Sequence, residues 1–96
     1  MHKYNPPHPG EFIREVYLEP YGIGFSLVAE KLKVSPSLFY RLIKGQSDIT
    51  PEMALRLSKT LGRSPESWLI MQNNYNLWQT KENVNLDDVE KLDLPT

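Results

Sequence analysis

The stretch from residue 24 to residue 45 constrains the fold most, because it contains two short runs of helical spacing separated by one break. The apolar side chains that recur at this spacing are Val28, Ala29 and Leu32, then Phe39, Leu42 and Ile43. At the break, Ser35 suits the cap of a second helix and Pro36 suits its first position, where the missing N–H costs nothing. The pattern predicts a helix-turn-helix in which both helices share one buried face.

The second predicted helix, residues 36–44, leaves a set of side chains off that buried face. The set consists of Ser37, Leu38, Tyr40, Arg41 and Lys44. In a DNA-binding helix-turn-helix the second helix enters the major groove, so this set and the capping Ser35 form the candidate DNA-binding surface. Arg41 carries a planar fork that fits guanine O6 and N7, whereas Lys44, at the helix end, suits a phosphate.

Charge is divided unevenly along the chain, although the formal net charge is only −1. Residues 31–63 contain seven basic and two acidic side chains, whereas residues 64–96 contain two basic and six acidic side chains. This division suits a protein in which one surface meets DNA phosphates and the C-terminal part meets another, basic partner. A solvated surface of mixed charge is the alternative that the same counts allow.

Length and composition favour a single small domain in the cytoplasm. A chain of 96 residues can bury one helical core, and dimerisation would add stability to so small a domain. The chain contains no cysteine, which excludes disulfides and thiolate metal sites. It has neither a secretory signal nor a run long enough to span a bilayer, so we expect a soluble protein without membrane contact.

Prolines define the remaining elements of an all-α fold. Three of them favour an extended arm over residues 1–9, and Pro20 ends a first helix that begins near Gly10. Thr50 and Ser64 each precede a proline and repeat the capping device at the start of a fourth and a fifth helix.

The predicted organisation is one five-helix domain over residues 10–80, between the arm and an acidic tail over residues 81–96. Gly62 stops the fourth helix, and the fifth ends at about Gln79. In the tail, a short helix over residues 87–92 and a disordered segment are both open alternatives.

The fifth helix carries more apolar side chains than one narrow stripe can hold. They are Trp68, Leu69, Met71, Tyr75, Leu77 and Trp78. The surplus requires another cover, and a second copy of the chain is the simplest one. We therefore predict a homodimer with an interface made of Met71, Tyr75, Leu77 and Trp78. In the alternative, the helix caps only its own core and the acidic tail folds over the rest.

No pattern in the sequence indicates catalysis or a metal site. His2 and His8 lack ligand partners at a recognised spacing, and His8 suits a packing or capping position in the arm. A nucleophile with its base, a glycine-rich phosphate loop and a carboxylate pair are not evident. We expect a protein that is not an enzyme and uses no cofactor.

The segments that flank the helix-turn-helix resemble the HigA-type antitoxins, which include VapI-like proteins and belong to the lambda-repressor-like superfamily. The resemblance covers about residues 6–78. Its most specific parts are His8-Pro9-Gly10-Glu11, Ile49-Thr50-Pro51, Ala54-Leu55-Arg56-Leu57 and Ser64-Pro65-Glu66, followed by Trp68, Leu69, Gln72, Tyr75 and Leu77.

This resemblance implies a five-helix lambda-repressor-like domain that dimerises through its last helix. Such proteins neutralise a RelE-like, mRNA-cleaving toxin of the HigB type and repress their own operon by binding a palindromic double-stranded operator. The family pattern places base contacts at Ser37, Leu38 and Arg41, with Tyr40 and Lys44 near phosphates. The toxin would meet either the first helix with the arm, or the acidic tail.

The sequence departs from the family pattern at the start of the first helix of the motif. Gly24 and Phe25 stand where relatives have a polar cap and a polar phosphate contact, and Leu27 also lies on the outer side. Pro36 likewise removes a side-chain donor from the first position of the second helix of the motif. We expect DNA binding to be weaker, or to depend more on Arg41, Lys44 and backbone N–H groups.

Two other classes of function remain beside the antitoxin. One is a helix-turn-helix repressor without a toxin partner, which the flanking motifs disfavour. The other is an interaction protein whose helix-turn-helix serves only as a scaffold, which the basic segment and Arg41 disfavour.

Overall fold

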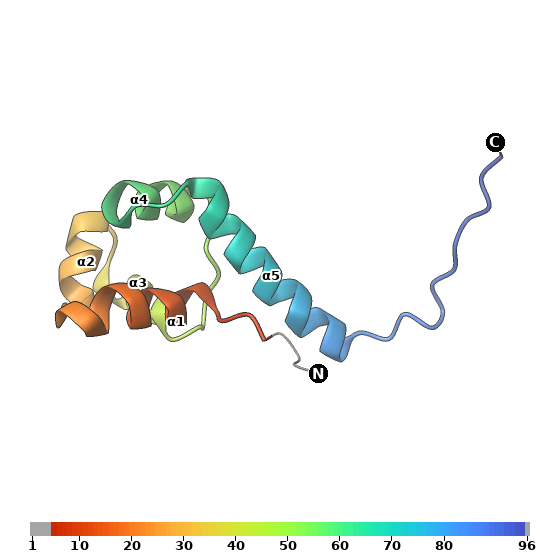
Figure 1. Ribbon diagram of the computed structural model, residues 1–96, viewed down its shortest axis with the longest axis horizontal. Coiled ribbons are helices and arrows are strands. Elements are labelled where there is room, and N and C mark those ends of the chain that lie inside the picture. The colour runs from red at the N-terminus through yellow and green to blue at the C-terminus, as the bar shows by residue number, and fades with distance from the viewer. Residues whose placement is uncertain (1–4, 96) are drawn as a thin grey trace.

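The computed structural model describes residues 5–95, and all regular secondary structure within that range is helical (Figure 1). The elements are α1 (Pro9–Ile13), η1 (Arg14–Leu18), η2 (Glu19–Tyr21), α2 (Phe25–Leu32), α3 (Pro36–Ile43), α4 (Pro51–Leu61) and α5 (Pro65–Asn83). The first three elements follow one another without a break and form the predicted first helix. The five-helix fold predicted from the sequence is confirmed.

Serine and threonine caps begin the helices where the sequence predicted them. The Ser35, Thr50 and Ser64 hydroxyls accept hydrogen bonds from the backbone N–H groups of Leu38, Met53 and Ser67 at 3.1, 3.2 and 3.0 Å. Each cap is followed by a proline in the first turn. These contacts satisfy N–H groups that a helix leaves without intrahelical partners.

One apolar core lies between the helices and is filled from all of them. Its largest fully buried side chains include Ile13, Leu32, Phe39, Leu57 and Trp68. The Trp68 indole packs near the rings of Phe12 and Tyr17, with centroid distances of 6.0 and 6.1 Å, and donates a hydrogen bond to the Gly62 carbonyl at 2.9 Å. The start of α5 is therefore part of the core.

Glycine allows α1 to cross the end of α3 at backbone contact distance. A Cβ at Gly10 would overlap the Leu42 carbonyl oxygen. The His8 side chain caps this helix, because its Nδ1 accepts a hydrogen bond from the Gly10 N–H at 2.9 Å. The capping or packing position predicted for His8 is confirmed. The close contact of Gly10 with Leu42 attaches this end of the arm to α3.

The first helix is less regular than predicted. The segment Arg14–Leu18 is a π-helix, and Pro20 lies within the 3-10 turn Glu19–Tyr21. The helix ends at Gly22, which adopts a left-handed conformation with a φ of 63°. Pro20 thus tightens the last turn, and the glycine ends it.

The C-terminal part differs from the prediction in two ways. Helix α5 continues to Asn83, beyond the expected end near Gln79, and includes residues 81–83, which were expected to belong to the tail. Beyond it, residues 84–95 are exposed and extended, with a turn in which the Val89 N–H donates to the Leu86 carbonyl at 2.9 Å. The alternatives of a tail helix and of a tail folded over α5 are wrong (Figure 1).

Within residues 5–95, every helix falls short of the length and apolar character needed to cross a lipid bilayer.

Candidate nucleic-acid interface

Helix α3 divides its side chains between the core and one exposed face, as its periodicity predicted. Phe39, Leu42 and Ile43 are buried. The exposed set is Ser37, Leu38, Tyr40, Arg41 and Lys44, with Ser35 exposed at the cap. The structure thus brings all six predicted DNA-binding residues onto one surface, called the reading face below.

A hollow of about 320 Å³ opens between α3 and the start of α4, beside the reading face. Four apolar side chains line it: Val34, Leu38, Leu42 and Met53. Four charged side chains also line it: Arg41, Asp48, Glu52 and Arg56. Leu42 and Met53 are buried and form its floor, whereas Leu38, Arg41 and the two acids are exposed at its mouth.

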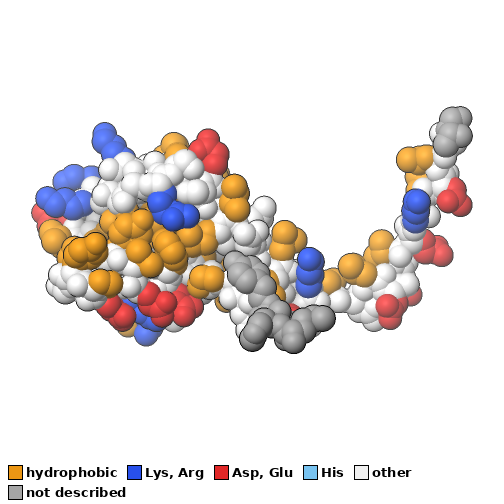
Figure 2. Space-filling model, viewed as in Figure 1, with side chains coloured by type: hydrophobic (Ala, Val, Ile, Leu, Met, Phe, Trp, Pro, Cys, Tyr) orange, Lys and Arg blue, Asp and Glu red, His pale blue; other side chains and the backbone are white. Residues whose placement is uncertain are grey.

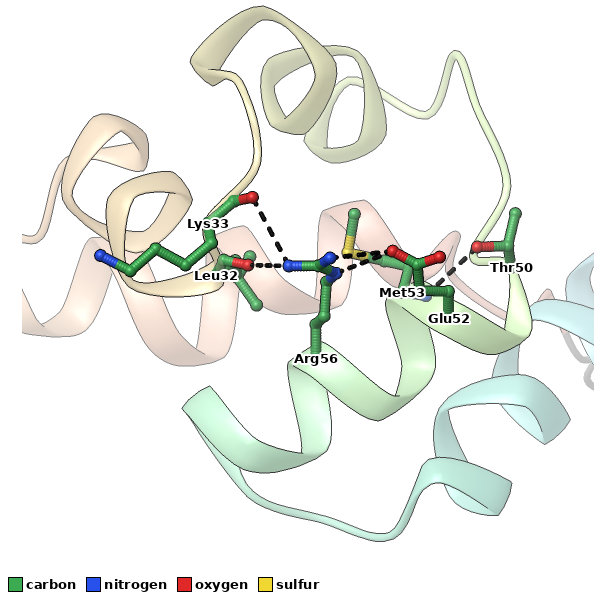
Figure 3. A network of polar contacts seen from close by, with 6 residues as sticks. All are labelled: Leu32, Lys33, Thr50, Glu52, Met53 and Arg56. Carbon is green, nitrogen blue, oxygen red and sulfur yellow. Dashed lines mark hydrogen bonds and ion pairs between the residues drawn. The ribbon is translucent and has the colours of Figure 1, made fainter.

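Arg56 ties the turn of the motif to α4 (Figure 3). Its Nη1 donates to the carbonyls of Leu32 and Lys33 at 2.8 and 3.5 Å, and its Nε and Nη2 donate to Glu52 Oε2 at 3.1 and 2.9 Å. The carbonyls at the end of α2 lack intrahelical partners, so the guanidinium satisfies them. This role of Arg56 was not predicted, although its i,i+4 spacing from Glu52 was a signal for the ion pair.

The opposite border of the reading face is aromatic. The Phe25 and Tyr40 rings lie 5.1 Å apart between centroids, and Lys44 Nζ lies 5.8 Å from the Tyr40 ring centroid. Gly24 precedes α2 without a side-chain cap, as its sequence predicted. Phe25 therefore supports Tyr40 where relatives are expected to have a polar side chain.

A hydrogen-bonded chain fixes the loop after α3 to helix α5. The buried Gln72 accepts from the Ile49 N–H at 2.8 Å and donates to Asn76 at 3.1 Å. Asn76 in turn donates to Asp48 Oδ2 at 2.9 Å. This role of Gln72 was not predicted, because a single polar residue in a helix does not reveal a partner 23 residues away.

His8 lies at the junction of the arm, α3 and α5. Only 5% of its surface is exposed, and its ring packs edge-on against Tyr75 with a centroid distance of 4.9 Å. Burial lowers the pKa of His8, an effect that Asp48, the Ser47 backbone and Glu11 partly offset. Among residues 5–95 there is no group of acidic, histidine or cysteine side chains that could hold a metal ion. His2 lies outside the described residues.

The basic segment predicted to face DNA is shared between two sides of the domain. Arg63 stacks over Phe12 and Trp68, with its Cζ 5.1 and 5.6 Å from the two ring centroids, and Arg56 is engaged at the turn. Arg41 and Lys44 remain exposed on the reading face. The count of basic side chains over residues 31–63 therefore overstated the charge available to DNA.

The predicted dimer residues begin at Met71, near the middle of α5, and continue into its second half. Met71, Tyr75 and Trp78 are half-buried, whereas Leu77 is 53% exposed. Tyr75 lies between His8 and Trp78 and accepts a hydrogen bond from Gln79 at 2.8 Å. Ile70, 59% exposed, was not included in the predicted interface although it lies on the same helix.

Comparison with known proteins matches residues 23–68 to the helix-turn-helix family. Virulence-associated protein I of Dichelobacter nodosus is 42% identical over 82 residues, which cover 82% of this chain and 76% of the relative. Antitoxin HigA-1 of Vibrio cholerae is 35% identical over 79 residues, covering 82% and 74%. A solved structure of Pseudomonas aeruginosa antitoxin HigA with the higBA promoter is 28% identical, covers 83% of this chain and 96% of that chain, and superposes with a TM-score of 0.71.

Proposed function

The chain belongs to the family of helix-turn-helix regulators and antitoxins that includes virulence-associated protein I and HigA-1, and on that premise we propose that it is an operator-binding antitoxin. The observation that carries the proposal is the reading face, where one short capped helix presents Arg41 and Lys44 to solvent. The fold family is one of DNA-binding proteins and not of enzymes. Operator DNA also implies that the protein works in the cytoplasm of a bacterium.

In this proposal the side chains of α3 divide into base-reading and positioning groups. Arg41 pairs with guanine O6 and N7, because no other side chain on the reading face offers two coplanar donors. Ser35 and Ser37 lie at the helix start, where hydroxyls and backbone N–H groups approach the DNA backbone and base edges. Lys44 and Tyr40 meet phosphates at the other end of the helix.

A second copy of the chain would complete the interface with DNA. We assign the dimer contact to Met71, Tyr75, Leu77 and Trp78 of α5, because the helix continues beyond its last buried residue, Gln72, and past the other helices (Figure 1). A two-fold dimer presents two α3 helices to successive major grooves about 34–36 Å apart, and this geometry requires a palindromic operator. Doubling the contacts is how such small domains reach specific affinities of about 10⁻⁸ M or tighter.

The antitoxin activity is assigned by the family and by the charge of the chain. HigA-1 is named an antitoxin, and we propose that this chain likewise neutralises a HigB-type, RelE-like toxin. An enzyme that cleaves RNA presents basic side chains to phosphates, and the tail beyond α5 offers acidic ones (Figure 2). A repressor without a toxin partner is the second candidate, since helix-turn-helix regulators are also among the relatives.

Operator binding is tested by two variants of the reading face. Arg41→Ala should weaken binding by about 1–3 kcal/mol and relax the preference at one base pair of each half-site. Lys44→Ala should weaken binding to all DNA sequences alike and reduce the slope of log affinity against log salt concentration by about one unit. Binding to single-base-pair operator variants distinguishes them, and an unchanged sequence profile for Arg41→Ala contradicts the assignment.

Expression of the neighbouring reading frame distinguishes an antitoxin from a repressor without a toxin partner. A toxin encoded there should arrest growth, and this chain should restore growth and copurify with the toxin. Arg41→Ala should keep that rescue while losing repression of a reporter placed behind the operator. A neighbouring product that neither arrests growth nor binds the chain would leave repression as the function.

A further inference from the structure

Leu38 is an apolar side chain on the surface assigned to base reading. It is 39% exposed and lies three residues before Arg41, so both side chains project from the same face of α3. Leucine cannot form hydrogen bonds with a base edge. The apolar group that bases present in the major groove is the 5-methyl of thymine.

The hollow beside Leu38 is suited to an uncharged group. Its floor is apolar, formed by Leu42 and Met53, and two carboxylates stand at its mouth. Asp48 is held there by Asn76, and Glu52 is held by Arg56. The two carboxylates balance the Arg41 and Arg56 cations that also line the hollow, so it has no net positive charge to attract a phosphate, and Arg56 is already engaged by Glu52 and by the end of α2.

We propose that Leu38 and the hollow form a subsite for the thymine 5-methyl group, beside the guanine assigned to Arg41. The inference rests on the proposed operator binding and names the group of the operator that Leu38 recognises. Three residues of an α-helix advance by about 4.5 Å, close to the rise of one base-pair step of about 3.4 Å. The thymine is therefore expected within two base pairs of that guanine.

The test removes the methyl group from DNA and leaves the protein unchanged. Duplexes bound by the full chain are enriched from a random pool, and each thymine of the resulting operator is replaced in turn by deoxyuridine. Deoxyuridine keeps the base pair and all its hydrogen bonds but lacks the methyl group. We expect binding to weaken about three- to tenfold at one thymine of each half-site, within two base pairs of the position relaxed by Arg41→Ala, and to be unchanged at the others.

Two variants assign that effect to Leu38. Leu38→Ala should bind the thymine and deoxyuridine operators equally, whereas Leu55→Ala should keep the full difference. Leu55 is the matched control, because it is exposed on α4 and does not line the hollow.

Four results overturn the subsite. A flat deoxyuridine profile, an operator without thymine in that window, or a difference that persists in Leu38→Ala would each refute the subsite while leaving operator binding intact. If no duplex is enriched, operator binding itself fails and the subsite fails with it.

Discussion

The two halves of α5 place similar side chains in different surroundings. Trp68 and Gln72 in the first half are buried and bonded to the Gly62 carbonyl and the Ile49 N–H. In the second half, Trp78 is only half-buried, and its Nε1 has no hydrogen-bond partner among the described residues. The first half completes the core of its own chain, whereas the second half extends past the other helices (Figure 1) and exposes Leu77.

The difference supports the proposal that one helix serves both the core of its own chain and a dimer. The hydrophobic contribution of the first half is already used in folding, because Trp68 is fully buried and packs near the rings of Phe12 and Tyr17. The second half retains exposed aliphatic area at Leu77, which is available for association. Paired substitutions of the same residue type in the two halves test this division directly.

The largest difference is expected between the two tryptophans. Trp68→Ala should lower the free energy of unfolding by about 3–5 kcal/mol, because a fully buried indole and its hydrogen bond to Gly62 are lost. Trp78→Ala should leave the unfolding of the dilute protein within about 1 kcal/mol and should weaken the dimer. Urea unfolding at two protein concentrations, combined with sedimentation, measures both. Equal losses from the two variants, independent of concentration, would show that α5 is core throughout.

Gly10 tests how closely α1 packs against α3. Gly10→Ala should lower the free energy of unfolding by about 3 kcal/mol, the upper end for overpacking, because the added methyl overlaps the Leu42 carbonyl. Gly24→Ala is the control, because its Cβ would meet nothing within 4 Å; a smaller loss of about 1 kcal/mol is expected, because alanine is a poorer helix cap than glycine. Comparable thermal denaturation of the two variants would mean that α1 can move away from α3.

The two glutamines of α5 repeat the comparison with polar side chains. Gln72→Leu should cost about 1–3 kcal/mol, because the buried Ile49 N–H loses its acceptor. Gln79→Leu should change stability by less than about 0.5 kcal/mol, because its contact with the Tyr75 hydroxyl is exposed. Hydrogen exchange at the Ile49 amide reports the loss directly. Unchanged protection of the Ile49 amide in Gln72→Leu would show that Gln72 does not hold the loop in place.

Local patterns in the sequence were sufficient to predict the helices and the reading face. The Ser35, Thr50 and Ser64 caps act within three residues, and the spacing of Phe39, Leu42 and Ile43 determines which face of α3 is buried. Such signals depend on short stretches of chain.

The contacts that join distant segments could not be predicted in the same way. The Arg56 contact with the Leu32 carbonyl and the Gln72 contact with Ile49 span 24 and 23 residues and depend on the packing of whole helices. The hollow is likewise a product of how α3 and α4 meet. The end of α5 was placed too early because the polar residues after Gln79 continue a helix without packing on the core.

The smallest effect is expected from protonation of His8, which packs against Tyr75 in the second half of α5. Its Nδ1 accepts the capping hydrogen bond from Gly10, and a protonated ring can no longer accept it. Burial lowers the folded-state pKa of His8 below the ordinary 6.5, so its contribution to stability is present above pH 6.5. As the pH falls towards the folded pKa, the unfolded chain binds the proton more readily and this contribution is lost.

The variant His8→Asn isolates this effect, because asparagine is also a good helix cap but does not titrate in this range. The free energy of unfolding is measured for both proteins at a series of pH values between about 7.5 and 5, a window that spans the ordinary histidine pKa. The wild-type protein should lose more stability than His8→Asn as the pH decreases, because only the wild type has the buried imidazole. If the two curves remain parallel, the His8 pKa is not lowered in the folded protein. If the wild type instead gains stability relative to the variant at low pH, Asp48 and Glu11 outweigh burial and the sign of the shift is reversed.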